Sequence, residues 1–169
     1  YGCYSQRIGQ IIHFISKKSF NIDGFGEKQA KQFFELQFIK KYEDIFKLQK
    51  FKKNIIQLEG WGEQSFLNLI KSIEISKKIS LDKFIYSLGI RFIGEINSEL
   101  LANEFNDIDS LISAIKNREK LENIDGLGPK AIASLIEYFS YKENLDTVKS
   151  LQSILNISKN TSPKQINYF

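Results

Sequence analysis

The sequence predicts an all-α fold, and three observations support this. Apolar residues recur in several separate stretches at the i, i+3, i+4, i+7 spacing of one helix face, as at Leu81, Phe84, Ile85 and Leu88. Alternation of apolar and polar residues, which indicates a strand, is not sustained over any stretch. Glycine pairs separate the helical stretches at regular intervals, as turns between helices do. With 42% hydrophobic and 26% charged residues, the composition is globular rather than disordered.

Each predicted helix has its own apolar stripe or N-terminal signal. The clearest further stripes run over Phe66–Ile73, Ile108–Ile115 and Ile132–Phe139. Pro129 directly follows Gly128 and suits the first turn of a helix, where its missing N–H costs nothing. In chain order, the predicted helices cover residues 7–19, 27–36, 50–57, 63–77, 81–88, 95–105, 108–116, 118–122, 129–141 and 143–155.

The glycines form an internal repeat. Six of the ten glycines lie in three Gly-x-Gly triplets, each with a large apolar residue at its centre and an apolar–acidic pair before it: Ile22-Asp23-Gly24-Phe25-Gly26, Leu58-Glu59-Gly60-Trp61-Gly62 and Ile124-Asp125-Gly126-Leu127-Gly128. A looser fourth copy, Phe92-Ile93-Gly94, has Phe92 in place of the first glycine. The second glycines are 36, 32 and 34 residues apart, a length that suits two short helices and their connections. The chain is therefore predicted to contain four tandem helical hairpins.

A glycine turn that leads into a helix is suited to bind phosphate. Glycines let a ligand approach the backbone closely, and the first N–H groups of the helix, with its positive dipole end, favour an anion. Because such contacts involve the backbone and not the bases, binding to DNA is expected to be independent of sequence. The predicted DNA-binding residues are the turn glycines and nearby polar or cationic side chains: Gly24, Gly26, Lys28, Gly60, Gly62, Gln64, Arg91, Gly94, Gly126, Gly128 and Lys130.

Charge also favours a polyanionic partner. The net charge is +4, and residues 1–80 carry 14 Lys and Arg against 8 Asp and Glu, whereas residues 81–169 carry 10 against 12. A solvated lysine-rich surface gives the same numbers, and the triplets also fit simple tight turns in a protein-interaction scaffold. A nucleotide-binding G-x-G-x-x-G loop fits less well, because Gln29 stands where the third glycine belongs and no strand precedes the loop.

Composition disfavours several other classes of protein. The single cysteine, Cys3, cannot form an internal disulfide or, alone, a zinc site, which needs about four ligands. No apolar run approaches the roughly 18 residues of a membrane span, and no signal peptide is recognisable. His13 lies among apolar residues and is interpreted as structural, and no Ser/His/Asp or Cys/His catalytic arrangement is recognisable. The chain has no methionine and is interpreted as a fragment or a processed product.

Four stretches resemble one known family. Cys3–Arg7, His13–Lys18, Asn21–Lys28 and Leu88–Glu95 are similar to the patterns C-P-A-Q, H-F-V-S-R-K, N-I-D-G-L-G-E-K and L-G-I-R-x-V-G-E of bacterial NAD-dependent DNA ligases. The hairpins resemble the helix-hairpin-helix motif, so the resemblance implies four tandem motifs in a SAM/RuvA-like helical domain. It covers about residues 1–157 and corresponds to the region of the ligase that follows the adenylation and OB domains.

The resemblance also implies a division of the chain. Residues 1–20 would be the end of a zinc-finger region and the first helix, with Cys3 as the last of four zinc-binding cysteines and the other three upstream. Residues 21–157 would be a tandem helix-hairpin-helix DNA-binding domain. Residues 158–169 would be a linker toward a BRCT domain that this chain does not contain.

The function implied by the resemblance is DNA binding without catalysis. The family's nucleophile is the lysine of a K-x-D-G motif, but the two comparable sites of this chain have Asn21 and Asn123 there. We therefore expect the chain to be inactive alone and to hold no cofactor, whereas the whole ligase would use NAD, Mg and Zn. The expected partner is nicked double-stranded DNA, bound by a monomer in the bacterial cytoplasm, with no membrane and no small-molecule substrate. The alternative is a non-catalytic helix-hairpin-helix module of a repair or recombination complex.

Overall fold

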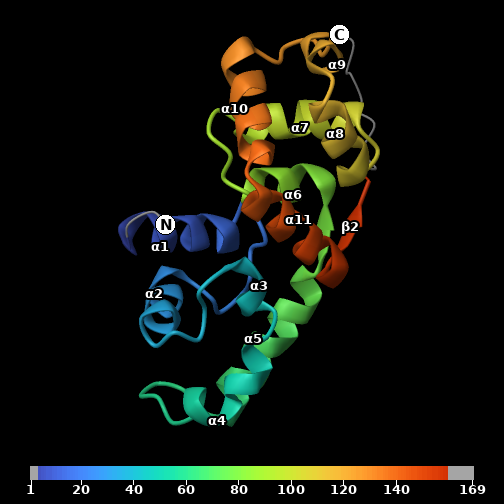
Figure 1. Ribbon diagram of the computed structural model, residues 1–169. Coiled ribbons are helices and arrows are strands. Elements are labelled where there is room, and N and C mark those ends of the chain that lie inside the picture. Colours follow the sequence, from blue (N-terminus) through green and yellow to red (C-terminus); the bar gives the residue numbers. More distant parts are fainter. Residues whose placement is uncertain (1–3, 160–169) are drawn as a thin grey trace, which may run out of the picture.

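Helices make up almost all of the regular structure (Figure 1). The computed structural model describes residues 4–159. Its helices, in chain order, are α1 (Tyr4–Ile15), α2 (Glu27–Glu35), α3 (Tyr42–Ile45), the 3₁₀ helix η1 (Leu48–Phe51), α4 (Lys52–Ile55), α5 (Glu63–Ser76), α6 (Leu81–Ser87), α7 (Glu95–Glu104), α8 (Ile108–Ile115), α9 (Arg118–Glu122), α10 (Pro129–Ser140) and α11 (Lys142–Ile154). Two three-residue strands are also present, β1 (Lys78–Ser80) and β2 (Asn156–Ser158). The predicted all-α fold is confirmed.

The helices differ from the predicted ones mainly at α1 and before α5. α1 ends at Ile15 rather than at residue 19, and the Ser16 hydroxyl there donates a hydrogen bond to the His13 carbonyl at 2.7 Å, which competes with a further helical turn. In place of one helix over residues 50–57, the structure has η1 and α4, and α3 is an addition to the predicted set. Helices of four residues are too short to show an apolar period.

β1 and β2 form a parallel pair that the sequence does not predict. They run in register from Lys78↔Asn156 to Ser80↔Ser158, and the Asn156 N–H donates to the Lys77 carbonyl at 2.8 Å. Strands of three residues are too short to show alternation, and β2 includes the first residue of the predicted linker. Because β1 lies between α5 and α6, the pair attaches the segment after α11 to the junction of these two helices (Figure 1).

Two hairpin-bearing halves follow each other along the molecule. The first runs from α1 to α5 and contains the glycine turns at Gly24 and Gly60, and the second runs from α6 to α10 and contains those at Phe92 and Gly126. In Figure 1 the halves extend in opposite directions, with α4 at one end of the molecule and α9 at the other. One continuous cluster of buried side chains runs through both halves, and its largest fully buried members include Phe14, Phe33, Phe66 and Phe84.

His13 joins the two halves. Its Nε2 lies 2.7 Å from the carbonyl oxygen of Tyr86 at the end of α6, and the two rings are 4.7 Å apart. These two contacts link α1 to α6 at a partly buried site. They agree with the structural role predicted for His13.

Candidate nucleic-acid interface

All four predicted hairpins contain the same backbone turn. We number them in chain order as hairpin 1 (residues 22–26), hairpin 2 (58–62), hairpin 3 (90–94) and hairpin 4 (124–128). In each, the carbonyl of the first residue accepts a hydrogen bond from the N–H of the fourth, at 3.2, 3.0, 2.9 and 3.2 Å. The third residue has a positive φ, at +77° for Gly24, +83° for Gly60, +64° for Phe92 and +88° for Gly126. A type II turn has this feature and favours glycine there, so hairpin 3 forms the common turn with phenylalanine in the position of glycine.

The fourth residue of each hairpin packs inward. Phe25, Ile93 and Leu127 are buried, and Trp61 is half-buried against Phe33 with the ring centroids 5.4 Å apart. These apolar side chains therefore anchor each turn to the packed interior of the protein.

The glycines around these anchors lie at the surface, which phosphate binding requires. An added Cβ would meet no heavy atom within 4 Å at five of them, namely Gly24, Gly60, Gly62, Gly94 and Gly128. The turns are therefore open to a ligand and are not packed inside the protein.

Each hairpin leads directly into a helix of at least nine residues. Gly26, Gly62, Gly94 and Gly128 are the N-caps of α2, α5, α7 and α10, and their carbonyl oxygens accept the first helical hydrogen bonds at 2.9 to 3.1 Å. The N–H groups before that bond have no partner inside the helix, and the positive end of the helix dipole lies beside them. Each hairpin therefore has the groups that attract an anion.

The capping glycines differ between the two halves. The Gly26 N–H donates to Gln29 Oε1 at 3.1 Å and the Gly62 N–H to Ser65 Oγ at 2.9 Å. In the part of the chain that the structure describes, no side chain accepts from the N–H of Gly94 or Gly128. The capping amides of hairpins 3 and 4 are therefore available to an anion. Those of hairpins 1 and 2 can bind an anion only after they break their hydrogen bond to a side-chain oxygen.

The second residue of the turn distinguishes hairpin 3 from the others. It is acidic in hairpins 1, 2 and 4, as Asp23, Glu59 and Asp125, but it is Arg91 in hairpin 3. A carboxylate repels a neighbouring phosphate, whereas a guanidinium forms charge-assisted hydrogen bonds with it. Hairpin 3 therefore has the most favourable turn charge for phosphate.

Hairpins 1, 2 and 3 are each followed by a glutamate at the first helical position, and each of these glutamates pairs with a lysine. The Nζ–Oε distances are 3.1, 3.7 and 3.1 Å for the pairs Lys31–Glu27, Lys52–Glu63 and Lys18–Glu95. Such exposed pairs contribute little to stability, so each lysine is free to exchange its carboxylate for a phosphate. α10 begins with Pro129 and has no acidic residue in its first turn.

Hairpins 3 and 4 meet at one exposed surface. Arg91 Cζ lies 5.0 Å and Lys130 Nζ 5.7 Å from the centre of the Phe92 ring, and Phe92 is 48% exposed. Together with the adjoining Gly94 and Gly128, these three residues are called the hairpin 3–4 tip. Four predicted site residues from two hairpins thus belong to one surface. Phe92 also belongs to it but was not predicted as a site residue, because the sequence marked it only as the residue that replaces the first glycine of hairpin 3.

Hairpins 1 and 2 share a groove instead. A cavity of about 660 Å³ is lined by Asp23, Gly24 and Lys28 on one side and by Glu59 and Gly60 on the other. Among the described residues that line the groove, Lys28 is the only cation, and the carboxylates of Asp23 and Glu59 line it as well. Of the predicted site residues of these hairpins, Gly24, Lys28 and Gly60 are therefore brought together in a groove of mixed charge, whereas Gly26 and Gly62 do not line it.

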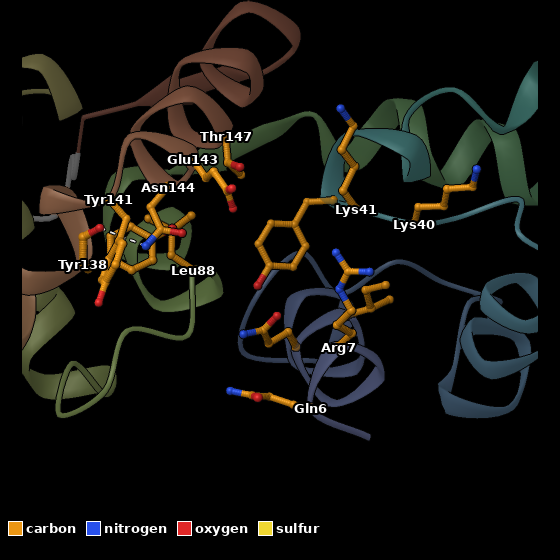
Figure 2. Close-up of a pocket in the computed structure, with 13 residues that line it drawn as sticks. Gln6, Arg7, Lys40, Lys41, Leu88, Tyr138, Tyr141, Glu143, Asn144 and Thr147 are labelled. Atoms are coloured by element: carbon orange, nitrogen blue, oxygen red, sulfur yellow. Dashed lines mark hydrogen bonds between the residues drawn. The ribbon is translucent and has the colours of Figure 1, made fainter. Parts of the chain in front are cut away.

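A further cavity, of about 430 Å³, is shown in Figure 2, and none of the described residues that line it belongs to a hairpin turn. Arg7, Lys40 and Lys41 lie on one side of it, and Tyr138 and Asn144 lie on the other. Asn144 Nδ2 donates to the Tyr138 carbonyl at 2.8 Å, and burial raises the pKa of the Tyr138 hydroxyl, which stays neutral at physiological pH. Sequence reasoning missed these cations, because no glycine turn accompanies the Lys40-Lys41 pair.

Other predicted features lie outside these surfaces. Gln64 does not line the groove of hairpins 1 and 2, and its Nε2 donates to Asn68 Oδ1 at 2.9 Å. Cys3, the predicted zinc ligand, lies outside the described residues. Within residues 4–159, no three His, Cys, Asp or Glu side chains gather in a way that could hold a metal ion. No helix in that same range has the length and apolarity to cross a membrane.

Comparison with known proteins agrees with this arrangement. A family model described as the helix-hairpin-helix motif matches residues 83–148, which contain hairpins 3 and 4. The chain is 40% identical over 99% of its length to a DNA ligase of Wolbachia pipientis subsp. Culex pipiens (strain wPip), of which it covers 27%. It is 42% identical to a DNA ligase of Rickettsia prowazekii (strain Madrid E) and 45% to one of Pelagibacter ubique (strain HTCC1062), in both cases over 92% of this chain and 24% and 23% of the relative.

The chain thus spans about a quarter of the length of the curated relatives it matches. The repeated turn, its open glycines and the matched motif all fall within the stretch that is similar to these proteins. The chain therefore contains the helix-hairpin-helix motif and is, over almost its whole length, a homologue of one region of DNA ligases.

Proposed function

We propose that the chain grips nicked double-stranded DNA through its backbone phosphates, as part of an NAD-dependent DNA ligase. The observation that carries this proposal is the fourfold turn. The same hydrogen bond, positive φ and helix N-terminus recur at four places in a homologue of DNA ligases. Repetition matters because one turn is a weak anion site, whereas several on one chain bind a long polyanion with multiplied affinity.

Each hairpin contacts the DNA backbone in the same way. Free N–H groups at the start of the helix donate to phosphate oxygens, and the positive dipole end adds to the attraction. Lys28, Arg91 and Lys130 add charge-assisted hydrogen bonds. Because none of these groups distinguishes one base from another, affinity depends on salt and on the shape of the duplex rather than on base sequence.

The chain contributes positioning rather than bond formation. Sealing a nick requires that the two DNA ends be held in near-attack geometry, and a clamp on both sides of the nick supplies this. Asn21 and Asn123 stand where the nucleophilic lysine of a K-x-D-G motif would be. We therefore assign the chemistry of NAD and Mg to other parts of such a ligase and Cys3 to its zinc site. We expect the chain to act as a monomer in the bacterial cytoplasm.

The proposal is tested by adding bulk to two turns without straining them. Gly94 and Gly128 have φ values of −86° and −77°, which any residue adopts, and both face open space. In the double variant Gly94→Leu/Gly128→Leu, the new side chains block the approach of phosphate. We expect the dissociation constant for a nicked duplex to rise about tenfold or more in a fluorescence anisotropy titration. Circular dichroism is expected to show unchanged helix content.

The matched control is Gly9→Leu, at an open position in α1 that is outside the hairpins. This variant introduces the same side chain and is expected to bind as the wild type does. Raising the salt concentration should weaken wild-type binding steeply, because each released counterion contributes to the slope. If the double variant, with intact helices, bound the nicked duplex as tightly as the wild type, the phosphate role would be refuted.

A further inference from the structure

We propose that Phe92 contacts the deoxyribose of the DNA backbone, between phosphates that are bound by Arg91 and Lys130. This inference rests on the proposed function, since it assigns to one side chain a specific part in binding DNA. The partner surface is the sugar–phosphate backbone of a duplex and not its bases.

The backbone at Phe92 is the first observation. Phe92 has a φ of +64°, in the left-handed region that glycine adopts freely and a bulky residue adopts at a cost. The equivalent residues of the other three hairpins are glycines. The Phe92 carbonyl accepts a hydrogen bond from Asn97 Nδ2 at 2.8 Å, which holds the strained turn in place. The turn therefore presents an aromatic ring at a position where the other three turns present none.

The ring is not placed there for the core. Phe92 is 48% exposed, whereas its neighbour Ile93 is buried at 3% and anchors the turn. Among the described residues, Phe92 stacks on no other aromatic ring, and the two cations Arg91 and Lys130 lie over its ring. Burial of the ring thus does not compensate for the strained backbone, so a ligand contact is the better explanation.

The combination of groups at the tip matches the chemistry of a nucleic-acid strand. Along each strand, a deoxyribose with apolar C–H groups lies between two phosphates. At the tip, the apolar ring lies beside Arg91 of hairpin 3 and Lys130 of hairpin 4, within 5.0 and 5.7 Å of its centre. The cations pair with phosphates, and the ring covers the sugar that lies between these phosphates. Ring and cations are already assembled by cation–π contacts, so little ordering is required on binding.

The test uses the variant Phe92→Gly in the full chain, because it gives hairpin 3 the glycine of the other three turns. Removing the strain should leave the melting temperature unchanged or raise it. The dissociation constant for a nicked duplex should nevertheless rise roughly five- to tenfold, because the sugar contact is lost. The slope of log K against log salt should stay the same, since no phosphate contact is removed.

Phe92→Asn controls for the flexibility of glycine. Asparagine also tolerates a positive φ but has no ring, so it should lose the same affinity as the glycine variant. A loss with glycine but not with asparagine would assign the effect to a flexible turn and overturn the inference. A loss that is larger for a single strand than for the duplex would indicate base stacking and would overturn it as well.

Lys130→Gln separates this inference from the proposed function. Loss of one phosphate contact should weaken binding and reduce the salt slope by about one. If Lys130→Gln weakens binding and Phe92→Gly does not, the sugar contact is refuted while the phosphate-binding function stands. If the variant Gly94→Leu/Gly128→Leu, with intact helices, binds like the wild type, the proposed function itself fails.

Discussion

Hairpins 1 and 2 share one backbone turn with hairpins 3 and 4 but differ from them in the groups that surround it. At hairpins 1 and 2, side chains occupy the N–H groups of the capping glycines, and the carboxylates of Asp23 and Glu59 line the common groove. At the hairpin 3–4 tip the capping amides have no side-chain acceptor within residues 4–159, and Arg91 and Lys130 lie beside an exposed ring. One repeated element therefore provides two electrostatic environments.

This difference shows that the net charge of a stretch of the chain does not predict the charge at its hairpin turns. Residues 1–80 hold the surplus of basic residues, yet both turns in this half carry an acidic residue. Many of its lysines lie elsewhere: Lys40 and Lys41 line the cavity of Figure 2, and Lys50 lies over the Phe51 ring. We therefore expect the less basic half of the chain to contain the stronger phosphate-binding surface.

The largest effect is expected from reversing the charge of the hairpin 3–4 tip. In Arg91→Glu/Lys130→Glu, two attractions to phosphate become repulsions, so the dissociation constant for a nicked duplex should rise about 100-fold at low salt. Fluorescence anisotropy measures this change. Lys28→Glu makes the same kind of change at hairpin 1 and should cost about tenfold or less. A greater loss with Lys28→Glu than with the double variant would invert the proposed ranking of the two surfaces.

A smaller effect, in the opposite direction, is expected at hairpins 1 and 2. Neutralising the groove in Asp23→Asn/Glu59→Gln removes two repulsions, so affinity for duplex DNA should increase by a factor of about three to ten. The gain should shrink as salt is added, because these carboxylates are exposed and screened. Asp125→Asn at hairpin 4 serves for comparison and should give a smaller gain. Unaltered affinity in the double variant would show that hairpins 1 and 2 do not face the DNA.

The smallest effect concerns the cap of hairpin 2. Ser65 Oγ accepts a hydrogen bond from the Gly62 N–H and donates one to the Gly62 carbonyl at 3.1 Å, so Ser65→Ala should lower the free energy of unfolding by about 1 kcal/mol. Thermal denaturation should show a decrease of roughly 2–4 °C. DNA affinity should stay within about twofold of the wild type, because the freed amide resembles those of hairpins 3 and 4. An unchanged melting temperature would show that this cap does not stabilise α5.

Local features of the fold were predictable because their causes are local. The glycine turns join residues three apart through one hydrogen bond, and the helices after them begin where the spacing places them: α2 at Glu27, α5 at Glu63 and α7 at Glu95. The short elements α3, η1, β1 and β2 could not be predicted, because three or four residues are too few to show the apolar periodicity of a helix or a strand. In the site, the glycines and Lys130 follow from the repeat, whereas the cations of Figure 2 do not.

The sequence by itself thus determined that four turns of one kind exist and that each precedes a helix, because backbone conformation and capping depend on neighbours in the chain. Only the tertiary structure decided which turns meet. Lys130 reaches Phe92 because hairpins 3 and 4 lie side by side in one packed half, and β2 pairs with β1 because α11 returns to the junction of α5 and α6. Such contacts depend on how helices pack across a shared core, which the spacing of residues along one helix does not specify.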